Sequence, residues 1–134
     1  MRTYSFDADV LIYAATPGHK LGEPVWQLLE REPGNVFGST LLIPELLIKP
    51  VRLRNEAEIA VLTAVLGRLD LLDVTDSVAT LAVELGAAYT LKAADALHLA
   101  TAVWLGADQF VTNNSKDFRS DRVTEIDVVY PAQL

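Results

Sequence analysis

The sequence predicts an α/β fold: a central, mainly parallel sheet of four to five strands with helices on both of its faces. Short strand-like apolar segments alternate with helical ones along the whole chain. Such alternation requires right-handed crossovers, which make the strands parallel and cover the sheet on both sides. The chain of 134 residues is 51% hydrophobic and contains no linker or repeat, so we expect one domain over residues 1–134.

The first half of the chain supplies two strands and three helical segments. Apolar runs bounded by turn residues predict the strands, and apolar positions three and four residues apart predict the helices. Pro24 stands near a first helical position, where its missing N–H costs nothing, and Pro50 is expected to stop a helix. The expected elements are a strand at 2–6, a helical turn at 10–14, a helix from 22–24 to 32–34, a strand at 35–38 and a helix at 41–48.

The second half adds three strands and three helices. Asn55 with Glu58 resembles a capping box and starts one helix, and Thr75 or Asp76 caps the next. Small residues over 91–102 predict a helix that lies close against the sheet. The expected strands lie at 70–74, at 109–111 near the centre of the sheet, and at 124–129 on its edge.

Composition and charge narrow the functional classes. The chain has no cysteine, which excludes disulfides and thiolate metal sites and fits a reducing compartment. It lacks a signal-like start and any segment long enough to span a bilayer, so we expect a cytoplasmic protein. The net charge of −7 argues against a general nucleic-acid scaffold, unless several of the acids surround divalent cations.

Asp7 follows the first strand directly. In an open parallel sheet the crevice lies outside the carboxyl ends of the strands, so an acid in this place points into the default site. The alternative is that Asp7 or Asp9 simply caps the following helix. The positions of later acids decide between the two.

Two further acids lie near helix starts. Glu45 stands in an apolar run, where an unpaired charge is expensive, so it needs either Lys49 at i+4 or a functional site as its partner. Asp95 lies in the first turns of a helix, where the dipole favours the ionised form. His98, one turn later on the same face, is interpreted as a hydrogen-bonded core residue outside the ligand set. His19 is interpreted as a solvated loop residue.

A second polar cluster follows the strand at 109–111. Thr112, Asn114 and Asp117 form this cluster, although each of them also suits an ordinary turn. Carboxylates brought together from these segments would repel one another, so the cluster makes sense only with bound cations. Oxygen ligands without cysteine or paired histidines select Mg²⁺ or Mn²⁺ over Zn²⁺.

Four segments together resemble the motifs of PIN-domain nucleases, and in particular of the VapC-type toxins of toxin–antitoxin pairs. They are Phe6 to Tyr13, Glu45 in the helix after Ser39, Ala94 to Ala102, and Val111 to Phe118. The resemblance covers nearly the whole chain and implies a three-layer α/β/α PIN-like fold. It also implies a metal-dependent endoribonuclease, with Mg²⁺ as the cofactor and Mn²⁺ as an alternative.

The resemblance assigns roles residue by residue. Asp7, Glu45 and Asp95 match the first three acids of the family, and Asp117 matches the acid before a phenylalanine in the toxin subgroup. Asn114 falls where many members carry an aspartate, which puts the strength of a second metal site in doubt. Asp9 falls where asparagine is commoner, so it either adds a ligand or caps the helix.

The implied reaction is hydrolysis of RNA phosphodiester bonds by water on a metal ion. One ion would be held by Asp7, Asp95 and Asp117, and a second would lie nearer Glu45. Thr112 and Asn114 would orient ligands or a substrate phosphate, with Asp9 in support. Lys116 and Arg119 would bind the RNA backbone. The implied partners are RNA, a cognate antitoxin and a second copy of the chain, docked through an apolar face between Val51 and Leu69, with no membrane contact.

Three alternatives remain open from the sequence. The chain could be a housekeeping RNA-processing nuclease, or a degenerate PIN scaffold that binds a partner without cutting. The segments from Asp7 to Asp9 and from Val111 to Asn114 also resemble the first two motifs of haloacid-dehalogenase-type phosphatases. That family needs a further lysine and an acidic pair well after the threonine, and only a short tail follows here.

Overall fold

The structure is a computed structural model that describes all 134 residues. Five strands alternate with six α-helices, and a short 3-10 helix ends the chain. The strands are β1 (Tyr4–Phe6), β2 (Val36–Ser39), β3 (Asp70–Leu72), β4 (Gln109–Val111) and β5 (Asp127–Val129). The helices are α1 (Ala8–Ala14), α2 (Gly22–Arg31), α3 (Leu42–Arg52), α4 (Glu56–Leu66), α5 (Asp76–Tyr89), α6 (Ala93–Leu105) and the 3-10 helix η1 (Pro131–Gln133).

All five strands are parallel and lie in the order β3-β2-β1-β4-β5. The first strand is therefore central, with Ser5 paired to Phe37 of β2 on one side and to Phe110 of β4 on the other. The expected neighbours at the centre, β1 and β4, are thus confirmed. Their carboxyl ends bring Asp7 and Thr112 to the same edge of the sheet.

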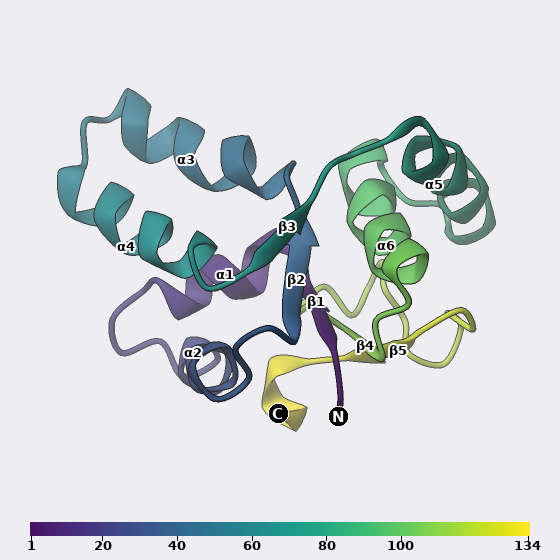
Figure 1. Ribbon diagram of the computed structural model, residues 1–134, viewed down its shortest axis with the longest axis horizontal. Coiled ribbons are helices and arrows are strands. Elements are labelled where there is room, and N and C mark those ends of the chain that lie inside the picture. The colour runs from purple at the N-terminus through teal and green to yellow at the C-terminus, as the bar shows by residue number, and fades with distance from the viewer.

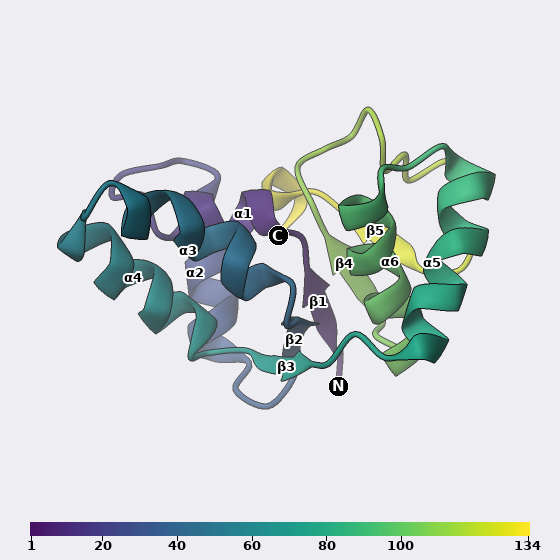
Figure 2. The ribbon, with the colours of Figure 1, turned by 90° about the horizontal axis from the view of Figure 1, so that it is seen from above.

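Helices cover both faces of this sheet, as Figures 1 and 2 show, with α1 to α4 on one side and α5 and α6 on the other. The side chains of each strand alternate between the two layers. Tyr4 and Phe6 belong to the core under α1 to α4, whereas Phe110 belongs to the core under α5 and α6. The expected three-layer α/β/α fold is confirmed.

Most expected boundaries agree to within two or three residues, but the prediction that Pro50 stops its helix is wrong. Helix α3 runs on to Arg52 with Pro50 buried inside it. The helix needs only two more residues there, and the N–H of Leu53 still bonds the Lys49 carbonyl at 3.0 Å. Asn55 caps α4 as expected, since its Oδ1 accepts from the Glu58 N–H at 3.1 Å.

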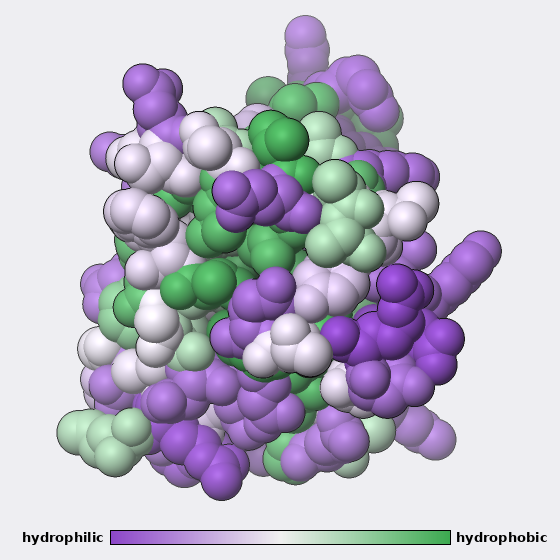
Figure 3. Space-filling model, turned by 90° about the vertical axis from the view of Figure 1, so that its right-hand side faces the viewer, coloured by the Kyte–Doolittle hydropathy of each residue, from purple (hydrophilic) through white to green (hydrophobic).

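The surface over α5 and α6 carries an apolar strip between hydrophilic margins, seen in Figure 3. Val83 is 72% exposed there. It borders an entirely apolar cavity of about 360 Å³, lined by Ala82, Val83, Leu91, Ala93, Ala96 and Leu97. None of the helices is both long and apolar enough to cross a bilayer.

Candidate functional site

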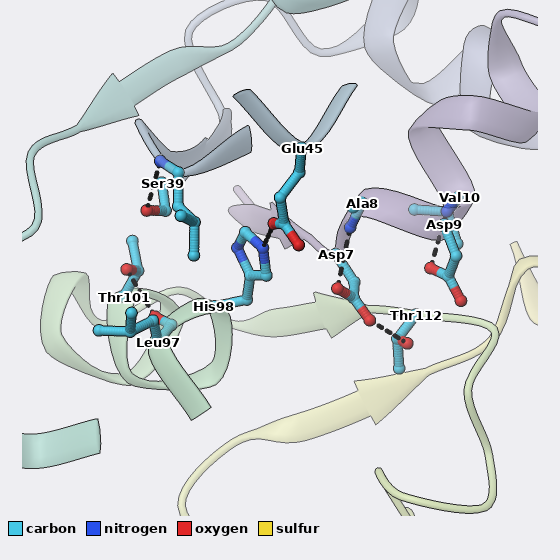
Figure 4. Close-up of polar contacts among 11 residues, drawn as sticks. Asp7, Ala8, Asp9, Val10, Ser39, Glu45, Leu97, His98, Thr101 and Thr112 are labelled. Carbon is cyan, nitrogen blue, oxygen red and sulfur yellow. Dashed lines mark hydrogen bonds and ion pairs between the residues drawn. The ribbon is translucent and has the colours of Figure 1, made fainter. Parts of the chain in front are cut away.

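Asp7 ends β1 and begins α1, so both interpretations of this acid hold at once. Its backbone N–H bonds the Val111 carbonyl at 2.9 Å, which extends the pairing of β1 with β4. Its Oδ1 accepts from the Ala8 N–H at 2.9 Å and caps the helix, while Oδ2 accepts from the Thr112 hydroxyl at 2.8 Å. Figure 4 shows the carboxylate between the helix start and Thr112. With only 5% of its surface exposed, Asp7 is fixed at the sheet edge.

The turn after β4 is held by its own side chains. The Asn114 N–H donates to the buried Thr112 Oγ1 at 3.1 Å. Asn114 and Asp117 then bond each other twice: Nδ2 of Asn114 donates to Asp117 Oδ2 at 2.9 Å, and the Asp117 N–H donates to Asn114 Oδ1 at 3.2 Å. The next residue, Phe118, is fully buried in the core against Phe110. The Asp117 carboxylate is therefore held in the turn by Asn114.

Asp9 joins α1 to the same turn. Its Oδ1 accepts from the Val10 N–H at 2.7 Å, and its Oδ2 accepts from the Asn113 N–H at 3.0 Å. Burial, followed by the charge of Asp7, raises the pKa of Asp9 to about 6. Both carboxylate oxygens already accept backbone hydrogens, so Asp9 acts here as a brace between the helix and the turn.

Glu45 pairs with His98, not with Lys49. The Glu45 carboxylate reaches from α3 to the Nε2 of His98 on α6, as Figure 4 shows, and Lys49 makes no ion pair. His98 is buried in the core, as expected, yet its hydrogen-bond partner is one of the predicted site acids. The hydrogen bond between Nε2 and the carboxylate fixes the direction of the Glu45 side chain. The other ring nitrogen, Nδ1, is buried and has no partner.

Burial and the charges of neighbouring acids shift the pKa of Asp7 and of Asp95. Burial raises the pKa of Asp7, against the lowering effects of His98 and of the Thr112 hydrogen bond, and the charge of Glu45 raises it further. The pKa of Asp95 is also raised, first by burial and then by the charges of Asp7 and Asp117. The charge of Glu45 thus acts on both Asp7 and Asp95, and that of Asp117 acts on Asp95. That these four acids form one site stays a prediction.

The acids near Asp7 are of a type that binds divalent cations, but their side chains are not arranged as a complete metal site. As they stand, no three His, Asp or Glu side chains are gathered closely enough to hold a metal ion between them. The donors are nevertheless hard carboxylate oxygens, and no lysine or arginine pairs with Asp7, Asp95 or Asp117. Asp95 and Asp117 are only half-buried, so their side chains have room to change rotamer.

The two predicted RNA-binding cations differ in their surroundings. Lys116 is exposed on the turn between Asn114 and Asp117 and makes no ion pair. Arg119 is also exposed, but its guanidinium binds Asp121 through Nε at 3.0 Å and Nη2 at 2.6 Å. The hydrogen bonds to Asp121 raise the pKa of Arg119. An RNA phosphate would have to compete with Asp121 for this side chain, whereas it would meet Lys116 directly.

Two contacts of the site were missed by sequence reasoning. The first is the bond between His98 and Glu45, whose only signal was the position of His98 one turn after Asp95. The second is a contact of Asn113, whose side-chain amide donates to the Tyr13 hydroxyl at 3.4 Å. No pattern in the sequence links Tyr13 to residue 113, because that contact depends on the pairing of β1 with β4.

Fold and site together define a class: a three-layer α/β/α protein in which a buried aspartate, Asp7, lies at the carboxyl edge of an all-parallel sheet. The model of the PIN domain matches residues 4–122, and the chain belongs to the PIN-domain family. PIN domains are nucleases, so the chain is a member of a nuclease family.

Solved structures share the fold over almost the full length. A toxin–antitoxin complex from Klebsiella pneumoniae is 24% identical, with a TM-score of 0.77, and the match covers 98% of this chain and 100% of that one. DNA-bound VapBC from Salmonella typhimurium is 19% identical, with a TM-score of 0.80 and coverages of 98% and 99%. FitAcB from Neisseria gonorrhoeae is 20% identical, with a TM-score of 0.77 and coverages of 98% and 100%. Curated protein sequences give no significant match.

Proposed function

We propose that the protein is a metal-dependent endoribonuclease and the toxin component of a toxin–antitoxin pair. One observation carries the catalytic part of this proposal. Burial raises the pKa of Asp7 and Asp95, the charges of Glu45 and Asp117 add to these shifts, and no lysine or arginine pairs with Asp7, Asp95 or Asp117. A divalent cation is the partner that makes such an arrangement tolerable. Membership of a nuclease family gives the reaction class.

Each site residue has a role in this proposal. Asp7, Asp95 and Asp117 hold Mg²⁺, or Mn²⁺ in its place, and Glu45 faces the same locality from α3. When bound, such an ion supplies Lewis-acid activation of water and neutralises charge on the phosphate. Thr112 keeps Asp7 oriented through its hydroxyl, and Asn114 does the same for Asp117. The exposed ammonium of Lys116 binds the substrate backbone.

The toxin role rests on the relatives. Structures of the same fold are described as a toxin–antitoxin complex and as VapBC, and we extend that assembly to this chain. The antitoxin would cover a groove of about 370 Å³ between the end of α1 and the start of α4. Ile12 and Val61 line this groove and are each more than 40% exposed, which is apolar surface that a partner helix can bury.

A homodimer in the cytoplasm completes the proposal. Two exposed apolar surfaces suit a second copy: the end of α3, where Val51 and Leu53 are 55% and 61% exposed, and the strip around Val83 on α5. Leu53→Asp and Val83→Asp each place a charge in one of them. Light scattering on the two variants identifies the interface, since only the variant at the interface becomes monomeric.

Cleavage and metal binding, measured together, test the proposed reaction. We expect the wild-type protein to bind Mn²⁺ and to cut single-stranded RNA only with Mg²⁺ or Mn²⁺ present. Asp7→Asn should abolish both properties, whereas Asp73→Asn, a change at an exposed aspartate after β3, should leave both intact. RNA cutting that persists in excess chelator would contradict the metal requirement.

One observation favours a second candidate, a PIN scaffold that does not cut. The acids are not gathered into a metal-binding geometry, and Asp117 is bonded to Asn114. A wild-type protein that neither binds Mn²⁺ nor cuts RNA would establish this candidate. Growth arrest on expression, relieved by Asp7→Asn, would instead support the toxin over a housekeeping nuclease.

A further inference from the structure

Two aromatic rings stack at the rim of the acid site. The phenol of Tyr13, near the end of α1, lies on the imidazole of His19 with ring centroids 4.2 Å apart and planes 10° apart. Both residues are only half-buried. The core aromatics Phe110 and Phe118, in contrast, are fully buried and meet edge to face. The stacked pair therefore presents aromatic surface to the solvent.

The pair is tied to the catalytic locality by hydrogen bonds. The Tyr13 hydroxyl accepts from the Asn113 amide at 3.4 Å, and the Asn113 N–H donates to Asp9. Tyr13 lies four residues after Asp9 on α1, a rise of about 6 Å along the helix. The backbone of Tyr13 thus stands roughly one helical turn from that of Asp9.

A cavity lies beside His19. Its volume is about 270 Å³, and its lining includes His19, Trp26 and the backbone of Gly18 and Gly22. Tyr13 does not line it, so the cavity opens on the part of the imidazole that Tyr13 leaves free. Ligand cavities for drug-sized molecules run from about 300 Å³ upward, so this one suits a single ring system.

The walls of the cavity are preformed. The Leu21 N–H donates to His19 Nδ1 at 3.1 Å, which fixes the ring on its loop. A Cβ at Gly22 would lie 1.9 Å from the Tyr13 carbonyl oxygen, so the start of α2 and the end of α1 touch. A ligand that enters finds His19 and Trp26 already in place, with little ordering cost.

Charge around the cavity selects the kind of ligand. Glu23 is in its lining and would repel a phosphate, but a carboxylate accepts hydrogen bonds from the amino group of a nucleobase. Beyond Trp26, the Arg68 guanidinium lies 5.4 Å from the centre of the indole ring and can take a phosphate outside the cavity. A base inside and a backbone phosphate at Arg68 match this distribution.

We propose that the cavity between His19 and Trp26 binds one unstacked nucleobase of single-stranded RNA, next to the nucleotide at the acids. The proposal names a substrate contact and rests on the nuclease function proposed above. Stacking on aromatic rings tolerates any base, because each base offers a flat face. The site would hold the strand in register for cleavage at the acids, with the base identity read only by Glu23.

Trp26 is a built-in reporter for this proposal. The chain has two tryptophans, so Trp104→Phe leaves Trp26 as the only one, and Asp7→Asn prevents cleavage. In the doubly substituted protein we expect an octamer of adenylate to quench Trp26 emission in a saturable way. An abasic octamer with the same sugar–phosphate backbone should not. A protein with Trp26→Phe in place of Trp104→Phe should show no quenching of Trp104.

The matched variant, His19→Asn, removes the imidazole ring and is expected to keep the conformation of the loop that carries it. In His19→Asn the amide oxygen can replace Nδ1 as acceptor of the Leu21 N–H, and the stacking surface is lost. We expect its affinity for the octamer to fall roughly 5- to 100-fold, with an unchanged circular dichroism spectrum and melting curve. Unchanged affinity in His19→Asn, or equal quenching by the abasic octamer, would overturn the proposal.

The result stays separable from the nuclease function. Metal-dependent cutting by the wild-type protein without any response of Trp26 would refute the base site and leave the nuclease intact. A base-dependent response lost in His19→Asn would support the base site even for a protein that does not cut RNA.

Discussion

Replacing Asp9 by asparagine should stabilise the protein at neutral pH. The pKa of Asp9 is raised from 3.8 to about 6 by burial and by the charge of Asp7. This rise in pKa corresponds to a loss of about 3 kcal/mol in the free energy of unfolding at neutral pH, as an upper limit. Asp9 is only half-buried, so solvent screening reduces this cost to about 2 kcal/mol. Asparagine can accept only one of the two backbone hydrogens, which offsets about 1 kcal/mol.

The net gain of about 1 kcal/mol should depend on pH in a definite direction. A raised pKa means that the folded state holds the proton more tightly than the unfolded state does. The carboxylate therefore costs nothing below pH 3.8, and its full cost is present above pH 6. The advantage of Asp9→Asn should appear between these values as pH rises and then remain constant.

Urea unfolding at pH 7.5 and pH 4.0 measures this difference. At pH 7.5 we expect Asp9→Asn to raise the free energy of unfolding by about 1 kcal/mol and the melting temperature by roughly 3–5 °C. At pH 4.0 the cost of the carboxylate is nearly gone while the hydrogen bond is still missing, so the variant should be less stable than the wild-type protein by up to about 1 kcal/mol. Asp73→Asn, on the exposed surface, is the matched control and should show no such pH dependence. A loss of stability at pH 7.5, or an equal gain at both pH values, would refute the reasoning.

Three further substitutions test the supports of the site. His98→Gln keeps a donor at the position of Nε2 and should retain RNA cleavage, whereas His98→Leu leaves Glu45 without its partner and should lower kcat roughly 10- to 100-fold with little change in KM. Thr112→Val removes the hydroxyl that donates to a buried carboxylate, so urea unfolding at pH 7.5 should show a loss of about 1.5–3 kcal/mol. Phe118→Ala empties a fully buried position beside the Asp117 turn and should cost about 3–5 kcal/mol in the same assay. Equal kcat in the two His98 variants, or unchanged unfolding for either of the others, would count against the role given to that residue.

Local patterns predicted the arrangement of the sheet because each rule involved acts over a few residues. Alternating segments required parallel strands, and Asp7 and Thr112 each follow a strand directly. Their meeting at 2.8 Å then follows from the pairing of β1 with β4. Pro50 is an exception to the rule that proline ends a helix. Its ring is buried within α3, and this burial outweighs the one backbone hydrogen bond that proline cannot make.

Contacts between helices could not be predicted in the same way. Glu45 and Lys49 satisfy the i+4 rule, so the sequence left their pairing open as the alternative to a functional role for Glu45. The actual partner, His98, is 53 residues away, and the contact depends on how α3 sits above the start of α6. The stacking of Tyr13 on His19 likewise depends on the path of the loop between α1 and α2. The hydrophobic periodicity of a sequence predicts helices and strands, but it does not predict which side chains of different helices and loops meet.

The acids at the sheet edge lower the stability of the folded protein. Burial and mutual repulsion raise the pKa of Asp7, Asp9 and Asp95, so each of them destabilises the folded protein at neutral pH. Hydrogen bonds from Thr112 and from backbone N–H groups reduce this cost without removing it. A neutral side chain of similar size at any of these positions would fold at least as well on electrostatic grounds. Acids that destabilise their own fold are typical of functional sites, and here Asp7 and Asp9 at the start of α1 and Asp95 in the first turn of α6 are electrostatically coupled.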